Sequence, residues 1–457
     1  MSTLPILKKS SFLTLLIKDN FVYANLAYSD LTAERTYILS DSTDLSPLKF
    51  RLDDLIFSKN FWYEYFDSLE KVFDWDIVDR TFEGIFKIKE FEREEVGVSG
   101  IKVVIDDNQP FFKKIFLSIK EFSNDISLKI LDNKQFELLS SGIRDRLYYD
   151  DVFWIDLDIS HFSVFRSRNG SMQTSIFGKP SSQESSFVGC KIDWGNEIGL
   201  IDFMKSSKVP AFLSTDSSSE EIQNKWANLI AHNCEYIQDP VLRDLLRAFT
   251  TLQLLSIKKD NRERLGDTVC KNTGIFISGN IPNLLTKREL LLSIIDGLEL
   301  EGTFDLFVDK ENKILTFGKS MISKEQSEDI VVFKSDILPK AYRVLIPEVP
   351  NSSKNKIIFS GKASAQGVEG RDIYALGSVL QILKLPDIGE KVVVEGELKN
   401  GSIFQHFTSN KVEFLSSKNT ILYDYLVIDG RHRPIIYGPT AEGNRIKLKI
   451  WGDGDKE

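Results

Sequence analysis

Two aspartates stand at the end of an apolar run near the middle of the sequence. The run DVFWIDLD carries Asp156 and Asp158, and after Ile159 and Ser160 a second run, HFSVFRSR, begins. A carboxylate at the end of a buried strand, followed by a small hydroxyl residue in a tight turn, can hold a divalent cation beside a phosphate. Asp156 is therefore a candidate metal ligand, Asp156 and Asp158 are candidate catalytic carboxylates, and Ser160 is a candidate phosphate contact.

This turn lacks the glycines that a phosphate-binding turn needs. Backbone N–H groups approach a phosphate most easily where glycine leaves room, and here Asp158 and Ile159 take those positions. Two carboxylates so close together repel a triphosphate unless a cation lies between them. Two interpretations stay open: a structural hairpin that has lost its ligand, or a working phosphate or metal site.

Three further residues are candidates for the same site. Asp19 is the only acid in the turn of LTLLIKDNFVYANL near the start of the chain, where it also suits an ordinary turn. Gly279 and Asn280 follow the strand-like run GIFIS and precede Ile-Pro and a helical pattern. That context fits a loop that contacts adenosine, although a glycine at the end of a strand is commonly just a turn residue.

The elements that position these residues occur in an order that repeats. Strand patterns cover 11–17, 21–29 and 35–40, and helical spacing covers 60–73; a strand at 101–105, a helix at 109–124 and a strand at 127–131 follow. The order then restarts with strands at 151–158, 161–168 and 171–178, the second and third joined by Asn169-Gly170. Helices at 196–205, 218–233 and 239–257, a strand at 274–279, a helix at 286–297 and a strand at 304–308 complete it.

A domain-scale duplication of this kind is similar to the actin-like fold of sugar kinases and Hsp70-type chaperones, built from two ribonuclease H-like halves. The resemblance implies Mg-ATP as the cofactor. We expect halves at 1–150 and 151–330, followed by a β-rich barrel or sandwich domain at 331–457. In that last part short strands alternate with turn residues, and a single helix is predicted near 372–383.

The C-terminal sequence YDYLVIDGRHRPIIYGPTAEGNRIKLKIWGDG carries five notable residues: Asp429, Arg431, Arg433, Arg445 and Trp451. If the strand continues to Arg433, the two nearer arginines share one face. With Asp429 they form either a charge-paired lock on the core or an anion-binding pair, and Trp451 serves as an aromatic anchor.

This tail resembles the closing signature of the glutamate mutase L family, actin-like proteins found in bacteria beside a cobalamin-dependent mutase. The family also has an aspartate followed by glycines where this chain has the run from Asp156 to Ser160. Because those glycines are replaced, the resemblance implies an accessory or assembly protein with lost or altered nucleotide binding, and a protein partner that the sequence does not identify.

Composition narrows the class of protein. The chain has 457 residues, 42% hydrophobic and 27% charged, with a net charge of −9, which disfavours nucleic acid as a partner. Its three cysteines and four histidines show no metal-site spacing. Without an apolar run long enough to span a bilayer, we expect a cytoplasmic protein with no integral membrane segment.

Three hypotheses follow for the function. The first is the pseudo-ATPase accessory protein of glutamate mutase L type. The second is an active Mg-dependent ATPase or kinase that uses the pair Asp156 and Asp158. The third is a cytoplasmic scaffold similar to the actin-like protein of type IV pilus assembly, against which the extra C-terminal domain speaks.

Overall fold

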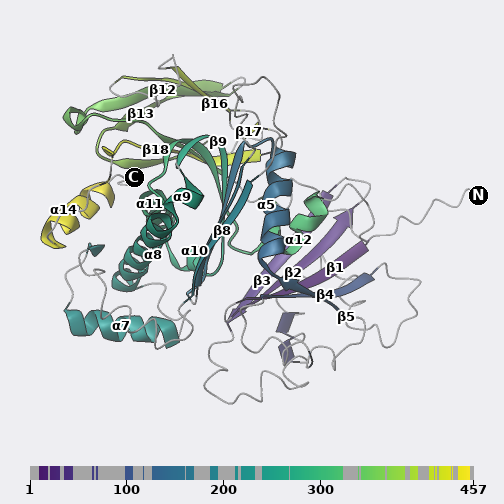
Figure 1. Cartoon of the computed structure of the whole chain (residues 1–457). Coiled ribbons are helices and arrows are strands. Elements are labelled where there is room, and N and C mark those ends of the chain that lie inside the picture. The colour runs from purple at the N-terminus through teal and green to yellow at the C-terminus, as the bar shows by residue number, and fades with distance from the viewer. Residues whose placement is uncertain are drawn as a thin grey trace, which may run out of the picture. The chain divides into compact units, whose positions relative to one another are not determined.

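The structure is a computed structural model of the whole chain (Figure 1). It describes residues 10–18, 21–30, 35–44, 64, 65, 68, 69, 98–106, 117, 126–159, 161–168, 186–193, 212–214, 218–231, 239–266, 268–322, 338, 341–365, 368–385, 392–399, 411–415, 417–418, 421–433, 435 and 441–452. The predicted helices at 109–124 and 196–205, the strand at 171–178 and the Asn169-Gly170 turn lie outside these residues, apart from residue 117. The described residues of the predicted helix at 60–73 are helical, with Tyr65 and Leu69 buried one turn apart.

The first half is built on a sheet of five strands in the order β3-β2-β1-β4-β5. Strands β1 and β2 are antiparallel, as are β2 and β3, whereas β4 is parallel to both β1 and β5. The bounds are β1 (Ser10–Lys18), β2 (Phe21–Asp30), β3 (Arg35–Asp44), β4 (Val98–Asp106) and β5 (Ile126–Leu131), after which comes α5 (Asn133–Leu147).

The second half repeats this strand order as β8-β7-β6-β9-β10, with the same pattern of antiparallel and parallel neighbours. Its strands are β6 (Asp151–Leu157), β7 (His161–Arg168), β8 (Ser186–Asp193), β9 (Val269–Ser278) and β10 (Glu301–Val308). Its helices are α7 (Ser219–Ala231), α8 (Pro240–Asp260), α9 (Arg262–Leu265), α10 (Ile281–Leu284), α11 (Lys287–Gly297) and α12 (Lys313–Ile322). The repeated order confirms the predicted fold class, a duplicated actin-like α/β architecture.

The C-terminal part is β-rich, as predicted. Strands β11, β18 and β14 continue the sheet of the second half beyond β10, and β13-β12-β15-β16 form a separate four-stranded sheet (Figure 1). The bounds are β11 (Ala341–Ile346), η2 (Asn351–Ser353), β12 (Ile357–Ala365), β13 (Val368–Leu376), β14 (Leu380–Lys384), β15 (Val392–Leu398), β16 (Lys411–Leu415), β17 (Ser417–Lys418), β18 (Ile421–Asp429) and α14 (Ala441–Gly452).

The helix predicted near 372–383 is wrong, because this segment forms parts of β13 and β14. Asp372, Tyr374 and Leu376 are exposed while Ile373 and Ala375 are buried, which is the alternation of a strand with one covered face.

Gly377 ends β13. A Cβ at this position would lie 2.1 Å from the carbonyl oxygen of Ser353, so only glycine allows this close approach of the two backbones.

The chain divides into two compact units, 1–142 with 309–339 and 143–308 with 340–457. Helix α12 follows β10 of the second half but belongs to the first unit, and the last turn of α5 belongs to the second. There Arg144 donates to the Ser167 hydroxyl at 2.9 Å and to the Arg168 carbonyl at 2.8 Å. The three-domain division at 150 and 330 stays a prediction.

Both faces of the second-half sheet are buried along β6, β7, β10 and most of β9. Residues such as Phe153, Ile155 and Ile277 join one hydrophobic core with residues of α8 and α11. On the other face the rings of Trp154, Phe276 and Phe307 stack in a row across the strands. Burial on both faces explains why β6 and the second part of β9 carry nearly continuous apolar runs in the sequence.

Two predicted helix starts have the caps that their sequences indicate. Asp239 accepts the N–H groups of Val241 and Leu242 at the start of α8. Thr286 and Glu289 form a reciprocal capping box at the start of α11. Among the described residues no helix is long and apolar enough to cross a membrane.

Asp309 fixes the start of the segment that leads into α12. Its carboxylate accepts the N–H groups of Lys313 at 2.8 Å and of Ile314 at 2.7 Å. Nearby, the Asn25 side chain of β2 donates to the Glu311 carbonyl at 3.2 Å. Burial raises the pKa of Asp309 to about 7, against the lowering effect of the two N–H groups.

The raised pKa gives the first prediction. A carboxyl group whose pKa rises from 3.8 to about 7 on folding contributes stability fully below pH 3.8, and this contribution is lost as the pH rises through 7. The measured quantity is the melting temperature of the wild type minus that of Asp309→Asn. We expect this difference to be lower at pH 8 than at pH 5. Asp372→Asn, at an exposed position, is the control, and a difference that does not change with pH would contradict the prediction.

Candidate functional site

The candidate site forms where β6 and β9 end. These strands are parallel, with Asp156 beside Ser278, so their carboxyl ends meet at the same edge of the sheet. The residues that follow each strand, Asp158 on one side and Gly279 and Asn280 on the other, are therefore brought together although they are more than a hundred positions apart in the sequence. This edge is where the sequence places the candidate phosphate and adenosine turns.

Hydrogen bonds connect the two turns directly. The backbone N–H of Asn280 donates to Oδ1 of Asp158 at 2.9 Å, and the Asn280 side-chain oxygen accepts the N–H of Ile159 at 3.2 Å. Beneath them the Ser278 hydroxyl donates to Oδ1 of Asp156 at 2.6 Å. The protein's own side chains thus occupy two backbone N–H groups at this edge.

Gly279 makes this close approach possible. Its φ of +102° lies in the region that favours glycine, and a Cβ at this position would lie 2.2 Å from the carbonyl oxygen of Leu157. The glycine is therefore required by the meeting of the two turns, whether or not a ligand binds there.

His161 completes a group that sequence reasoning did not identify. It starts β7, and its carbonyl oxygen accepts the N–H of Asp158 at 3.0 Å across the turn. Its Nε2 lies 3.7 Å from Oδ2 of Asp156 and 3.6 Å from Oδ2 of Asp158. Asp156 and Asp158 are each 1% exposed and His161 is 3% exposed, and one potential ligand atom from each lies within 4.8 Å of the others.

The signal that could have found His161 is its spacing. In the sequence D-x-D-x-x-H the three residues flank one tight turn, and alternation along the strands points their side chains to the same face. Of the other predicted residues, Asp156, Asp158, Gly279 and Asn280 come together as described. Asp19 and Ser160 lie outside the described residues.

The tail residues lie on the same sheet as the candidate site but at the opposite ends of its strands. Strand β11 is antiparallel to β10, and β18 is parallel to β11, so β18 ends where β10 begins. Asp429, the last residue of β18, is therefore far along the strands from Asp156. The structure does not bring the two groups of predicted residues together.

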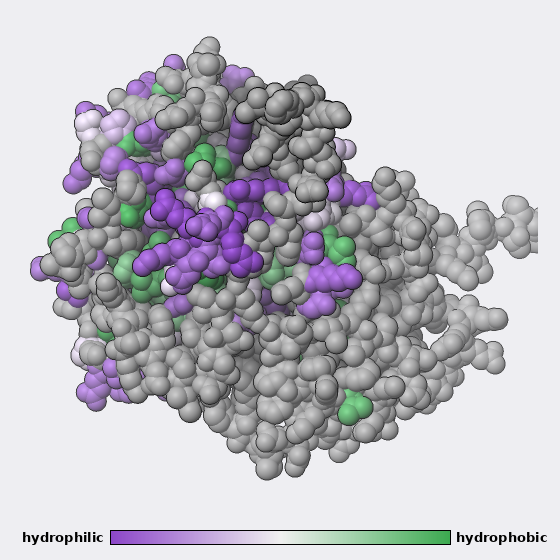
Figure 2. Space-filling view, in the orientation of Figure 1, coloured by the Kyte–Doolittle hydropathy of each residue, from purple (hydrophilic) through white to green (hydrophobic). Residues whose placement is uncertain are grey.

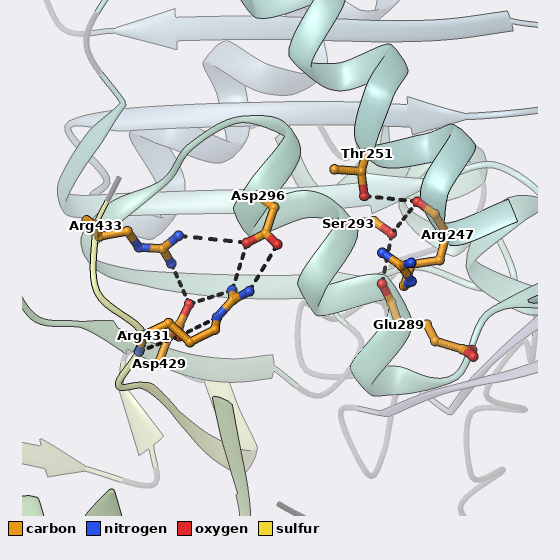
Figure 3. A network of polar contacts seen from close by, with 8 residues as sticks. All are labelled: Arg247, Thr251, Glu289, Ser293, Asp296, Asp429, Arg431 and Arg433. Carbon is orange, nitrogen blue, oxygen red and sulfur yellow. Dashed lines mark hydrogen bonds and ion pairs between the residues drawn. The ribbon is translucent and has the colours of Figure 1, made fainter. Parts of the chain in front are cut away.

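At that edge two aspartates and two arginines alternate in a closed ring (Figure 3). Arg431 donates to both oxygens of Asp296 in α11, at 2.7 and 3.0 Å, and to both oxygens of Asp429, at 2.8 Å each. Arg433 donates to Asp429 and lies 3.7 Å from Asp296. We call Asp296, Asp429, Arg431 and Arg433 the charge ring.

The charge ring is buried and has no net formal charge. Burial by itself raises the pKa of Asp429, but the charges of Arg431 and Arg433 outweigh it and hold that pKa below its usual value. A charge pair taken out of water is favourable only when its hydrogen bonds are nearly all made, as they are around Arg431. The geometry joins the end of β18 to the last turn of α11.

The predicted continuation of the strand through Arg431 and Arg433 is wrong. Strand β18 ends at Asp429, and the next residue, Gly430, pairs with the turn between β13 and β14. Its N–H donates to the Val379 carbonyl at 2.9 Å, and its carbonyl accepts the N–H of Ser378 at 2.7 Å. The arginines reach the ring from irregular backbone.

The other two tail residues lie on α14. The indole ring of Trp451 is 5.0 Å from the Arg431 guanidinium, a cation–π contact that connects this helix to the charge ring. Arg445 is half-buried on the same helix.

Comparisons with known proteins give structural likenesses only. No protein-family model matches this chain, and no curated protein does. An exopolyphosphatase from Cytophaga hutchinsonii is 12% identical, with a TM-score of 0.31 over 65% of this chain and 76% of that one. A Ppx/GppA family member from Aquifex aeolicus is 10% identical, with a TM-score of 0.29 over 59% of this chain and 66% of that one.

A protein from Bacteroides thetaiotaomicron described as having an actin-like ATPase fold is 6% identical, with a TM-score of 0.28 over 65% of this chain and 90% of that one. The activities named for these proteins are theirs. For the present chain, the fold class rests on the repeated strand order.

The charge ring gives the second prediction. Replacing Arg431 by Met leaves Asp296 and Asp429 buried with most of their hydrogen bonds lost, so we expect the free energy of unfolding to fall by about 3–5 kcal/mol. Arg431→Lys keeps the charge but not the double hydrogen bonds, and should recover only part of the loss. Urea denaturation measures both; a loss no larger than that of Arg262→Met, at an exposed position, would show that the ring contributes little.

Proposed function

We propose that this chain is a pseudo-ATPase: an accessory or assembly protein with the actin-like fold that neither binds nor hydrolyses ATP. The supporting observation is the closure of the phosphate turn by the protein's own groups. A nucleotide phosphate in such a turn is held by backbone N–H groups that point at it. Here the N–H of Asn280 is taken by the Asp158 carboxylate and that of Ile159 by the Asn280 amide.

The residues present do not suit Mg-ATP. The Asp158 carboxylate is an anion that occupies a donor a phosphate would use, and it is nearly fully buried. A triphosphate that displaced it would meet two carboxylates, and their repulsion is strong in a site of low dielectric constant. We therefore derive no reaction through this nucleotide.

The glutamate mutase L-type assignment is part of this proposal, since it rests on the tail sequence and on the fold. In the charge ring each arginine of the tail is paired with an aspartate. This supports a structural role for Asp429, Arg431 and Arg433 over recognition of an external anion.

An accessory role implies a protein partner, which stays unidentified. Figure 2 shows the hydrophobic residues of one face as small, separate groups among hydrophilic ones. Among the described residues, one exposed apolar group lies on β12 and β13, where Ile357 pairs with Leu376 across the strands and Tyr374 lies two residues away. This group is a reasonable first choice for a contact surface.

Calorimetric titration with Mg-ATP tests the pseudo-ATPase proposal. We expect no binding by the wild type at millimolar nucleotide, because the turn is closed. Micromolar binding by the wild type that Asp156→Ala abolishes and that the exposed-site control Asp260→Ala keeps would contradict it.

The double variant Asp158→Gly/Ile159→Gly restores the missing glycines and frees the Asn280 N–H. A gain of weak nucleotide binding in this variant alone is expected if the carboxylate is what closes the turn. Circular dichroism verifies that the variant keeps its secondary structure.

One observation favours the second candidate function, an active Mg-dependent ATPase or kinase. The convergence of Asp156, Asp158 and His161 would place a cation between the two carboxylates and reduce their repulsion of a phosphate. This second function requires at least that the pure protein releases phosphate from ATP. The Asp158→Asn variant should lose this activity. Phosphate release at the rate of the buffer blank would exclude ATP hydrolysis.

A further inference from the structure

We infer that the free edge of β13 binds an extended segment of a protein partner, which joins the β13-β12-β15-β16 sheet as a further strand. The segment that fits this edge carries apolar side chains in its middle and an acidic side chain at one end. The inference rests on the proposed accessory role for the existence of a partner, and it adds the chemistry by which that partner is recognised.

Strand β13 has one edge without a neighbouring strand. Strand β12 pairs with it on one side, and in the part of the chain that the structure describes no strand pairs with the other side. A sheet edge of this kind presents backbone N–H and C=O groups that can bond to a strand from another protein.

The end of β13 shows which residues face this free edge. The N–H of Gly377 donates to the Lys356 carbonyl at 2.9 Å, so this glycine faces the chain that leads into β12. Leu376, one residue earlier, faces the other way, and its N–H donates to Oε1 of Gln381 at 2.7 Å. The Gln381 side chain thus occupies the free edge at Leu376 and leaves the preceding part of the strand open.

Asp372 and Tyr374 direct their backbone groups to that open part. Successive residues of a strand face opposite edges, so these two face the same way as Leu376. Among the described residues nothing forms a hydrogen bond with them outside the ladder with β12. A buried N–H without an acceptor is costly, so these groups must be hydrated, and an added strand would replace the water.

The side chains beside the free edge are apolar at Tyr374 and Leu376. They are 49% and 38% exposed, and they point to the same face of the sheet because they are two residues apart. Aromatic or β-branched side chains opposite them on an added strand would pack against them. The backbone groups give affinity to such a segment, and these two side chains select apolar residues in it.

Three lysines make the end of this edge positive. Lys354 forms a β-bridge with Gly377, and the Lys356 carbonyl accepts the N–H of the same glycine. Lys399 donates its backbone N–H to the Ile358 carbonyl at 2.8 Å. All three lysines are exposed, and in the described part of the chain none has an ion-pair partner. Charge complementarity therefore favours an acidic residue at this end of the bound segment.

An extended segment fits this edge better than a second copy of the chain does. Two folded chains that met only along so short an edge would bury little surface, whereas stable interfaces between folded proteins bury about 1,200 Å² or more. An extended segment needs only the backbone bonds and a few side-chain contacts. It can also carry the acidic residue that the three lysines favour.

Selection of peptides on the full chain tests the inference, with a phage-displayed library of random twelve-residue peptides as the probe. We expect the enriched peptides to contain aromatic or β-branched residues followed or preceded by Asp or Glu, and to bind the purified chain in fluorescence anisotropy. Tyr374→Pro removes an outward N–H but no bond to β12, and should weaken this binding about 10-fold, as the loss of one backbone hydrogen bond does. Tyr374→Val keeps the N–H and an apolar side chain, and as the matched control it should bind nearly as well as the wild type.

A charge reversal tests the contribution of the lysines. The double variant Lys354→Glu/Lys356→Glu should weaken binding of the acidic peptides more than Tyr374→Val does, and the effect should shrink at high salt because exposed charges are screened. Lys259→Glu, at an exposed position on α8, is the control and should bind like the wild type. Equal binding by the double variant and this control would remove the acidic residue from the inference.

Hydrogen–deuterium exchange of the wild type gives a readout that needs no variant. We expect a selected peptide to slow exchange in the fragment that contains Asp372 and Tyr374. No enrichment above that on the Tyr374→Pro chain, binding that Tyr374→Pro leaves unchanged, or unslowed exchange in β13 would each overturn the inference. So would a wild-type dimer that Tyr374→Pro dissociates, because it would assign the edge to a second copy. No nucleotide is used, so a failure here is distinct from a failure of the pseudo-ATPase proposal.

Discussion

The parallel pairing of β6 with β9 is the constraint on which the candidate site depends. It sets Asp156 beside Ser278, and everything that follows the two strands is then forced into contact. Gly279 tolerates the resulting approach to the Leu157 carbonyl, where any side chain would collide. Once the backbones are this close, the polar groups of the two turns must find partners, since a buried N–H without an acceptor is costly.

In this chain they find one another, and this distinguishes the site from an open phosphate-binding turn. The Asp158 carboxylate and the Asn280 amide each accept one backbone N–H across the junction. The same arrangement that satisfies the backbone leaves one oxygen of each aspartate facing His161. The proposed closure against a phosphate and the grouping of these three side chains thus follow from one hydrogen-bond pattern.

At the opposite ends of these strands, the structure must hold the added C-terminal strands to the core of the second half. Strands β11, β14 and β18 lengthen the second-half sheet, and the charge ring joins the last of them to α11. Salt bridges of this degree of burial are costly to form but also costly to break, so they fix one arrangement of the elements that supply them. The contact of Trp451 with Arg431 extends that fixed arrangement to α14.

The sequence by itself determined those features that depend on residues close together along the chain. Apolar runs and turn residues predicted the duplicated strand order apart from β8 at 186–193, and the patterns that begin at 239 and 286 predicted where α8 and α11 begin, because these signals act over a few positions. Their positions at or just after the end of a predicted strand were also enough to identify Asp156, Asp158, Gly279 and Asn280 as candidates. The error at 372–383 arose where two short strands and a turn imitated one helix.

What only the tertiary structure decided are the partners of those residues. Nothing local indicates that the Asn280 N–H meets Asp158, or that Asp296 joins Arg431 across 135 positions of sequence. His161 became a candidate ligand only when its distance to both carboxylates was known. Such contacts are set by sheet register and by the paths of β6, β9 and β18, which depend on the packing of the whole second unit.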